Sequence, residues 1–159
     1  MERDIIEELG SLALATRLKN LSERLARDVS QIYKQSAFEF EPRWSALVYA
    51  LKDGEELSVT ELSNMLKQTH PAVNQVANVL VEKKLVDERK DEGDQRKRLL
   101  KLSKKGEKLV KQMSDLWQKI KEANDQLLKD TGGDLLNNLD KVESALDQES
   151  MFDRIRARQ

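Results

Sequence analysis

Residues 58–106 read SVTELSNMLKQTHPAVNQVANVLVEKKLVDERKDEGDQRKRLLKLSKKG, and this stretch decides the fold. Its first part, Thr60–Lys67, has two leucines one turn apart and predicts a short helix. A break follows, and then Pro71, whose fixed φ and missing N–H suit the first turn of a helix. We therefore expect a second helix from about Pro71 to Lys84, joined to the first by a turn.

The second predicted helix has an apolar face and a polar face. At 100° per residue, one side collects Val73, Val76, Ala77 and Leu80. The opposite side carries three amides, Asn74, Gln75 and Asn78. An amide has a donor and an acceptor that together match the N6/N7 edge of adenine in the major groove. The alternative is an ordinary solvated face, which is the commoner role of Asn and Gln.

Two strand-like runs follow this helix, Leu85–Arg89 and Arg98–Leu102, and the charged segment between them contains a glycine. This pattern predicts a β-hairpin, or wing. The cations Arg96, Lys97 and Arg98 lie near its end, where they suit contact with phosphates or with a narrow minor groove. Acidic residues stand beside them, and Asp94 is placed to hold a neighbouring arginine through charge-assisted hydrogen bonds.

The wing residues resemble a known family. Asp94–Ser103, followed by Gly106, is similar to the wing signature of MarR-type winged-helix transcription regulators, Asp-x-Arg, then five residues, then Leu-Thr or Leu-Ser. Leu57–Ser63 and Pro71–Val86 resemble the family's two DNA-binding helices. The resemblance implies a homodimeric DNA-binding regulator that a small ligand often releases from its site.

Charge is distributed in agreement with contact to double-stranded DNA. The whole chain has a net charge of −1, but residues 58–106 contain 11 Lys and Arg against 7 Asp and Glu, a local charge of +4. The flanking segments are both acidic. Local charge, rather than the charge of the whole chain, sets the affinity for phosphates. Thr69 and His70 lie directly before the second helix, and we expect them to contact the DNA backbone or solvent.

The flanking segments are predicted to be long amphipathic helices. Leucine, valine and isoleucine recur at three- or four-residue steps along one helix from about Asp4 to Gln35. Two more helices are expected at Lys104–Lys129 and Asp134–Arg156. These stripes exceed what one small winged domain can cover, and we expect them to pack on each other and across a two-fold dimer interface.

The expected fold is therefore mainly α: a winged helix-turn-helix with a two-stranded β wing and N- and C-terminal dimerisation helices. The predicted domains are an N-terminal dimerisation helix at 1–40, a DNA-binding domain at 41–106, and C-terminal dimerisation helices at 107–159. The expected partners of the chain are double-stranded DNA and a second copy of itself. The resulting homodimer is expected to bind DNA at an inverted repeat.

Five of the seven aromatic residues lie between positions 33 and 49. A small apolar or aromatic effector near Phe38, Phe40, Trp44 and Trp117 is one interpretation, and the family resemblance implies a site in that vicinity. The other is a hinge core that orients the winged domain, which is the more frequent role of clustered aromatic residues.

Composition excludes several other classes of protein. The chain has one histidine and no cysteine, which leaves no cysteine-ligated zinc and no evident nucleophile–base pair, and no glycine motif for phosphates is present. We expect no catalytic activity, no metal and no cofactor. The absence of cysteine fits the cytoplasm, and no apolar run reaches membrane-spanning length. The alternative function is a winged-helix module that binds protein without specific DNA binding.

Overall fold

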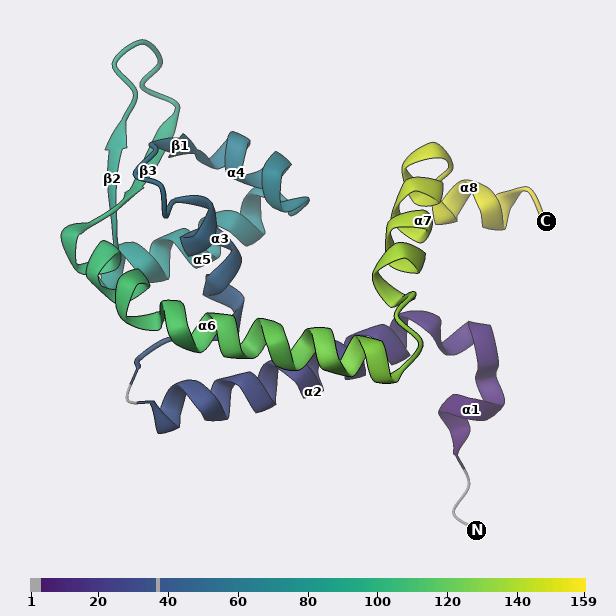
Figure 1. Ribbon diagram of the computed structural model, residues 1–159. Helices are drawn as coiled ribbons and strands as arrows, with labels where there is room; N and C mark the ends of the chain where they lie inside the picture. Colours follow the sequence, from purple (N-terminus) through teal and green to yellow (C-terminus); the bar gives the residue numbers. More distant parts are fainter. Residues whose placement is uncertain (1–3, 37) are drawn as a thin grey trace. The chain divides into compact units, whose positions relative to one another are not determined.

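The computed structural model describes residues 4–36 and 38–159, and Figure 1 shows the course of the chain. The described residues are mainly helical, as expected. In chain order the elements are α1 (Ile5–Leu9), η1 (Gly10–Ala13), α2 (Leu14–Gln35), η2 (Pro42–Trp44), α3 (Ser45–Ala50), β1 (Leu57–Ser58), α4 (Val59–Leu66), α5 (His70–Glu82), β2 (Val86–Lys90), β3 (Arg98–Leu102), α6 (Lys104–Asp130), α7 (Leu135–Gln148) and α8 (Met151–Arg156).

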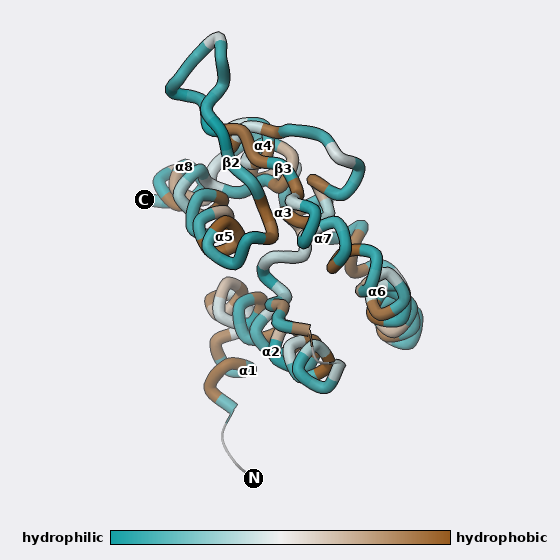
Figure 2. The backbone as a smooth tube through the Cα atoms, turned by 90° about the vertical axis from the view of Figure 1, so that its left-hand side faces the viewer, coloured by the Kyte–Doolittle hydropathy of each residue, from teal (hydrophilic) through white to brown (hydrophobic). Residues whose placement is uncertain are grey.

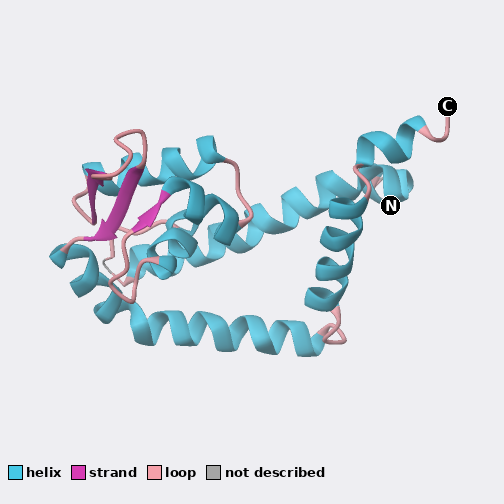
Figure 3. Cartoon of the chain, turned by 90° about the horizontal axis from the view of Figure 1, so that it is seen from above, coloured by secondary structure: helices cyan, strands magenta, loops and turns pink. Residues whose placement is uncertain are grey.

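The chain divides into two compact units, Met1–Met113 and Ser114–Gln159, with the boundary inside α6. All three strands belong to the first unit, where Figure 3 shows them in magenta. None of the helices in the described ranges is long and apolar enough to cross a membrane. The domain limits expected from the sequence stay a prediction.

The N-terminal helix is not continuous, which corrects the single helix expected over Asp4–Gln35. Asp4 caps α1 by accepting hydrogen bonds from the backbone N–H groups of residues 6 and 7. Gly10 then adopts a φ of +52°, a left-handed conformation that interrupts the helix, and the chain passes through η1 into α2. A single glycine was therefore enough to divide the helix.

The first unit has an aromatic cluster where α2 leads into η2. The Tyr33 and Phe40 rings meet edge to face with centroids 5.2 Å apart, and those of Phe40 and Trp44 do so at 5.5 Å. All three side chains are buried, as are Leu47 and Leu51 of the following segment. The cluster fills the centre of this part of the core.

Helices α4 and α5 form the helix-turn-helix, and their ends lie within one or two residues of the expected limits. Ser58 and Glu61 make a capping box at the start of α4, in which each side chain bonds the other residue's backbone N–H. At the start of α5 the Thr69 Oγ1 accepts a hydrogen bond from the Ala72 N–H. The inner faces are buried through Leu62 on α4 and, on α5, through Val73, Ala77 and Leu80.

The sheet has three strands in the order β1–β3–β2, which corrects the two-stranded wing expected from the sequence. The wing strands β2 and β3 pair in the antiparallel register Val86↔Leu102 to Lys90↔Arg98, and Figure 1 shows their hairpin projecting from the unit. The extra strand β1 pairs with the opposite edge of β3. It has two residues only, too few for an alternating pattern to predict it.

The start of α6 is fastened to the end of α5. The Ser103 hydroxyl donates a hydrogen bond to the Lys84 carbonyl and accepts one from the Gly106 N–H, at 2.7 and 3.0 Å. The Ser103 N–H donates to the Leu85 carbonyl at 3.1 Å. These bonds fix the end of the wing against the segment that follows α5, and they place Gly106 directly beside the Leu85 carbonyl.

Replacing Gly106 with Ala is expected to destabilise the protein by about 1–3 kcal/mol. A Cβ there would stand 2.1 Å from the Leu85 carbonyl oxygen and 3.1 Å from its carbonyl carbon. This backbone overlap outweighs the gain in helix propensity, about 1 kcal/mol. Urea unfolding measures the difference. Lys108→Ala, at an exposed position of the same helix, should change stability by less than about 0.5 kcal/mol; a Gly106→Ala protein as stable as that control would contradict the prediction.

The second unit differs from the single final helix expected over Asp134–Arg156. The chain leaves α7 at Glu149, in an extended conformation, and Ser150 starts α8 by accepting a hydrogen bond from the Asp153 N–H. A cap can therefore restart a helix inside an unbroken periodic pattern. The expected end of α6 is confirmed, because Gly132 and Gly133 both have positive φ.

Large apolar side chains remain exposed on the N-terminal helices and on α7 and α8, and Figure 2 shows brown and teal alternating along α1 and α2. On the N-terminal helices they are Ile5, Leu9, Leu12, Leu14, Leu18, Leu21, Leu25 and Ile32. On α7 and α8 they are Leu135, Leu136, Val142, Leu146, Met151, Phe152 and Ile155. The periodic stripes seen in the sequence are thus present on helix surfaces.

Candidate nucleic-acid interface

The polar face of α5 points out of the core. Burial of Val73 and Ala77 directs Gln75 and Asn78 to solvent, while Asn74 is half-buried. Thr69 and His70 are exposed at the N-terminal end of the same helix. The helix thus presents its amides together and its N-terminus beside them, where backbone N–H groups favour an anion.

Arg98 joins the wing to this amide face. Its Nη1 donates hydrogen bonds to the Oδ1 atoms of Asn78 at 2.7 Å and Asn74 at 3.2 Å. Its Nε donates to the Glu88 carboxylate on the neighbouring strand at 2.5 Å. Of the three wing cations selected from the sequence, Arg98 is the one whose side chain contacts α5.

Arg96, in contrast to Arg98, extends into solvent at the end of the wing. Its side chain is 96% exposed, and its Nε is 3.5 Å from the Asp94 carboxylate. The same Asp94 oxygen accepts a hydrogen bond from the Arg96 N–H at 3.0 Å. Lys97 is exposed beside it. The structure therefore brings Asp94 and Arg96 together in the arrangement that the spacing of the residues suggested.

The wing end is held by bonds within the loop. The Asp91 Oδ1 accepts hydrogen bonds from the Gly93 and Asp94 N–H groups, at 2.7 and 2.9 Å. These bonds, that from Asp94 first, lower the pKa of Asp91 below its ordinary value of 3.8. A lowered carboxylate pKa means that the contribution to stability is present above pH 3.8 and is lost as the pH falls through the lowered pKa. The charged Asp91 carboxylate is thus available to hold the loop through these two hydrogen bonds at neutral pH.

A second arginine lies on the other face of the wing, one residue pair away from the hairpin tip. Arg89 of β2 reaches across β3 to Glu56, with its Nε 3.0 and 3.1 Å from the two carboxylate oxygens. This contact lowers the pKa of Glu56 and raises that of Arg89. Sequence reasoning missed this pair, because the two residues are 33 positions apart and only the pairing of β1 with β3 makes them neighbours.

Sequence reasoning also missed the role of Glu88 and the direction of Arg98. A usable signal existed, because alternate residues of a strand share a face. Leu102 and Leu100 are the buried side of β3, and Arg98 is next on that side. Counting back along β3 in steps of two residues from Leu102 and Leu100 would have placed Arg98 on the inner face of the strand.

The residues suggested for an effector are only partly brought together. Phe40 and Trp44 are buried against each other in the aromatic cluster, and Phe38 is half-buried. Trp117 belongs to the second unit. The effector site stays a prediction, and at Phe40 and Trp44 a ligand would have to displace existing ring contacts.

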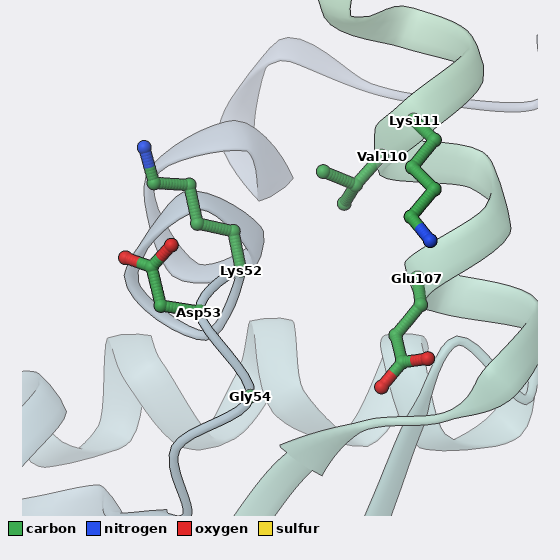
Figure 4. Close-up of a pocket in the computed structure, with 6 residues that line it drawn as sticks. All are labelled: Lys52, Asp53, Gly54, Glu107, Val110 and Lys111. Atoms are coloured by element: carbon green, nitrogen blue, oxygen red, sulfur yellow. The ribbon is translucent and has the colours of Figure 1, made fainter.

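A shallow hollow lies elsewhere in the first unit, between the loop after α3 and the start of α6 (Figure 4). It is lined by Lys52, Asp53, Gly54, Glu107, Val110 and Lys111. Lys52 is partly engaged, since its Nζ lies 3.8 Å from the centre of the Tyr49 ring. The hollow is lined by positively and negatively charged side chains and by one valine. This mixture does not favour a particular class of ligand.

A small antiparallel sheet beside two helices, with a cationic hairpin next to the second helix, defines a winged helix-turn-helix protein. Residues 39–97 match the MarR family. The resemblance found in the wing residues is confirmed.

Solved structures share this fold. S. aureus MepR, in a complex with DNA, is 20% identical with a TM-score of 0.70, over 83% of this chain and 97% of that one. A MarR/EmrR family transcriptional regulator from Acinetobacter sp. ADP1 is 24% identical with a TM-score of 0.67, over 87% and 97%. Bordetella bronchiseptica BpsR is 20% identical with a TM-score of 0.60, over 95% and 99%. A sequence comparison with curated proteins finds no match.

Proposed function

We propose that this chain is a sequence-specific transcription regulator that binds double-stranded DNA as a homodimer on an inverted repeat. The observation that carries the proposal is the continuity between the amide face of α5 and the wing, which Arg98 connects by hydrogen bonds to Asn74 and Asn78. A helix that enters the major groove beside a hairpin that follows the backbone needs this continuity. The MarR-family match over residues 39–97 supports the same function.

Each part of the surface has its own contact with DNA. Thr69 and His70 meet phosphates at the N-terminal end of α5, and Gln75 and Asn78 face base edges. Arg96 and Lys97, at the end of the wing, contact the neighbouring minor groove, where the negative potential attracts an extended cation. No catalytic step is part of this function, and its place is the cytoplasm.

The dimer is supported by the apolar side chains exposed on the N-terminal helices and on α7 and α8, the largest of which is Phe152 at 66% exposed. Water-exposed stripes of this length are unfavourable until a second copy covers them. Two-fold symmetry then dictates the DNA site. Two recognition helices entering successive major grooves require half-site centres about 10 to 10.5 base pairs apart, or a multiple of that.

The regulator is further proposed to be a repressor that a small apolar or aromatic effector releases from DNA. The solved structure of BpsR concerns regulation of its DNA binding by 6-hydroxynicotinic acid, which is a precedent on this fold. The effector must bind the DNA-incompetent conformation better than the competent one, since otherwise it shifts no population. A ligand screen with melting temperature and operator binding as readouts tests this part separately.

Selection of binding sites from a random duplex pool tests the central proposal. The full-length protein should enrich an inverted repeat, bind it at least about 10³-fold more tightly than random DNA, and lose affinity steeply as salt rises. A protein-binding winged-helix module is the alternative, and it would enrich no duplex and show no steep salt dependence.

Arg96→Ala should weaken operator binding by about 1–3 kcal/mol and leave the unfolding midpoint unchanged. The side chain is almost fully exposed and packs on nothing that the fold requires. Fluorescence anisotropy with the selected operator measures the affinity. Arg27→Ala, which removes an exposed arginine from α2, is the matched control and should bind normally. Equal affinities of the two variants would refute a DNA contact by Arg96.

A further inference from the structure

The Arg98 side chain lies on the inner face of the wing. Leu102 and Leu100 are buried, and Arg98 follows them on the same side of β3. Its side chain is 26% exposed, against 96% for Arg96. Because its backbone is fixed in the β2–β3 ladder, the guanidinium group is held over the polar face of α5.

The guanidinium contacts three acceptors on two elements. Glu88 accepts from Nε, while the Oδ1 atoms of Asn74 and Asn78 both accept from Nη1. Glu88 thus orients the guanidinium, and the guanidinium in turn orients the two amides. The bond to Asn78 is the shorter of the amide contacts, at 2.7 Å, and Asn78 is also the more exposed of the two amides.

The chemistry of arginine decides which end of each amide faces it. A guanidinium has donors only, and an Asn side chain has one acceptor end and one donor end. Only the Oδ1 end can face Arg98, since the Nδ2 end would place donors against donors. Both amides therefore turn their carbonyl oxygens toward the guanidinium, which uses one lone pair of each, and the NH₂ group is the end that is turned away from Arg98.

We infer that Arg98 is a specificity-determining positioning residue, which makes the Asn78 amide present its NH₂ group, rather than a donor–acceptor pair, to the DNA bases. This inference rests on the proposed DNA-binding function. A donor alone fits a base edge made of acceptors, namely N7 and O6 of guanine in the major groove. It does not fit the N6/N7 edge of adenine, which needs both ends of an amide, nor the N4 amino group of cytosine.

Gln75 provides a comparison on the same helix. Among the described residues no hydrogen bond holds its exposed amide, so both of its ends are available to a base. Gln75 can therefore pair with the N6/N7 edge of adenine, as an unrestrained amide does. The inference is that two neighbouring amides on one helix recognise different bases because only one is held by an arginine.

The experiment begins with the duplex sequence that the full-length protein selects from a random pool. Asn78→Ala and Gln75→Ala are then put through the same selection, and the position at which each variant loses its preference is assigned to that residue. The expected base is guanine at the Asn78 position, preferred over adenine by about tenfold, since one well-placed base contact is worth that much.

Arg98→Met tests the positioning role, because it keeps an unbranched stem and removes the guanidinium. The preference for guanine at the Asn78 position should fall from about tenfold to below about threefold, while the Gln75 position is unchanged. Lys101→Met is the charge-matched control on the other face of β3, and it should retain both preferences while binding all duplexes somewhat more weakly.

A second variant carries the test if Arg98→Met does not fold. Asn78→Asp keeps an acceptor for Arg98 and replaces the NH₂ group by a second acceptor. The preferred base at that position should change from guanine to cytosine, whose N4 amino group donates. Overall affinity should fall as well, because the new negative charge is repelled by the negatively charged DNA.

The outcomes separate the two proposals. If the wild-type protein selects no duplex, the DNA-binding function itself is wrong and the inference falls with it. If it selects a duplex, an adenine at the Asn78 position overturns the role of Arg98 alone. The same holds if the guanine preference is intact in Arg98→Met, or if Asn78→Asp shows no change of base.

Discussion

Replacing Trp44 with Ala is expected to lower the free energy of unfolding by about 3–5 kcal/mol, which is a large part of the stability of a domain of this size. Trp44 is 1% exposed, and its ring lies edge to face against Phe40, which contacts Tyr33 in the same way. Removing the indole leaves a cavity among residues that belong to α2, to the loop after it and to α3. These elements cannot move together to fill it, so most of the lost contact is not recovered.

Urea unfolding at a fixed protein concentration measures this effect, because a dimer couples stability to concentration. Trp44→Phe should cost less than the alanine variant. The indole N–H has no acceptor among the described residues, so the ring contributes by packing and a phenyl ring retains part of it. Tyr49→Ala, at a residue of the same region that is 57% exposed, is the aromatic control and should cost at most about 1 kcal/mol. A Trp44→Ala protein as stable as this control would show that the cluster is not a core.

The second large effect is expected for charges placed on the exposed apolar stripe of α7. The double substitution Val142→Asp with Leu146→Asp should yield a monomer at micromolar concentration. It should lower operator affinity by about 10²- to 10⁴-fold, because a dimer gains the second half-site as an intramolecular contact. Both side chains are more than 40% exposed in the single chain, so the two charges cost little until a second copy covers them.

Sedimentation velocity and operator binding are measured on the same samples. Ser144→Asp places a charge on the opposite side of α7 and should leave both the dimer and the affinity intact. Ending the chain after Gly133 removes α7 and α8 together and should reproduce the double substitution. If the wild-type protein is a monomer with full affinity for a single half-site, the proposed architecture is wrong.

Predictions from the sequence were accurate where a local pattern was sufficient. The limits of α4, α5 and α6 and the two wing strands follow from apolar periodicity, from Pro71 and from the glycines after α6, each of which acts within one or two turns of the chain. The buried side of α5 was predictable for the same reason. Val73, Ala77 and Leu80 are buried, and Val76, expected beside them, is half-buried.

Local patterns failed where a single residue outweighed the periodicity around it. The N-terminal apolar stripe continues through Gly10 and the C-terminal one through Ser150, yet a helix breaks at each of these residues. A positive φ ends the helix at Gly10, and a side-chain cap starts a new one at Ser150. Periodicity reports which face is apolar, but it does not report whether the backbone hydrogen bonds continue.

The sequence by itself determined that this chain is a helical protein with a winged helix-turn-helix, a basic centre between acidic ends, and a polar face on the second helix of that motif. Composition, periodicity and the Asp-x-Arg wing pattern carry that information because each acts over a short distance along the chain. Only the tertiary structure decided which groups the wing cations lie against. The pairing of β2 with β3, and their packing on α5, place Arg98 against Asn74 and Asn78, residues 24 and 20 positions away, and leave Arg96 in solvent. Side chains so distant in sequence meet through strand register and burial, and no local pattern of residues encodes that meeting.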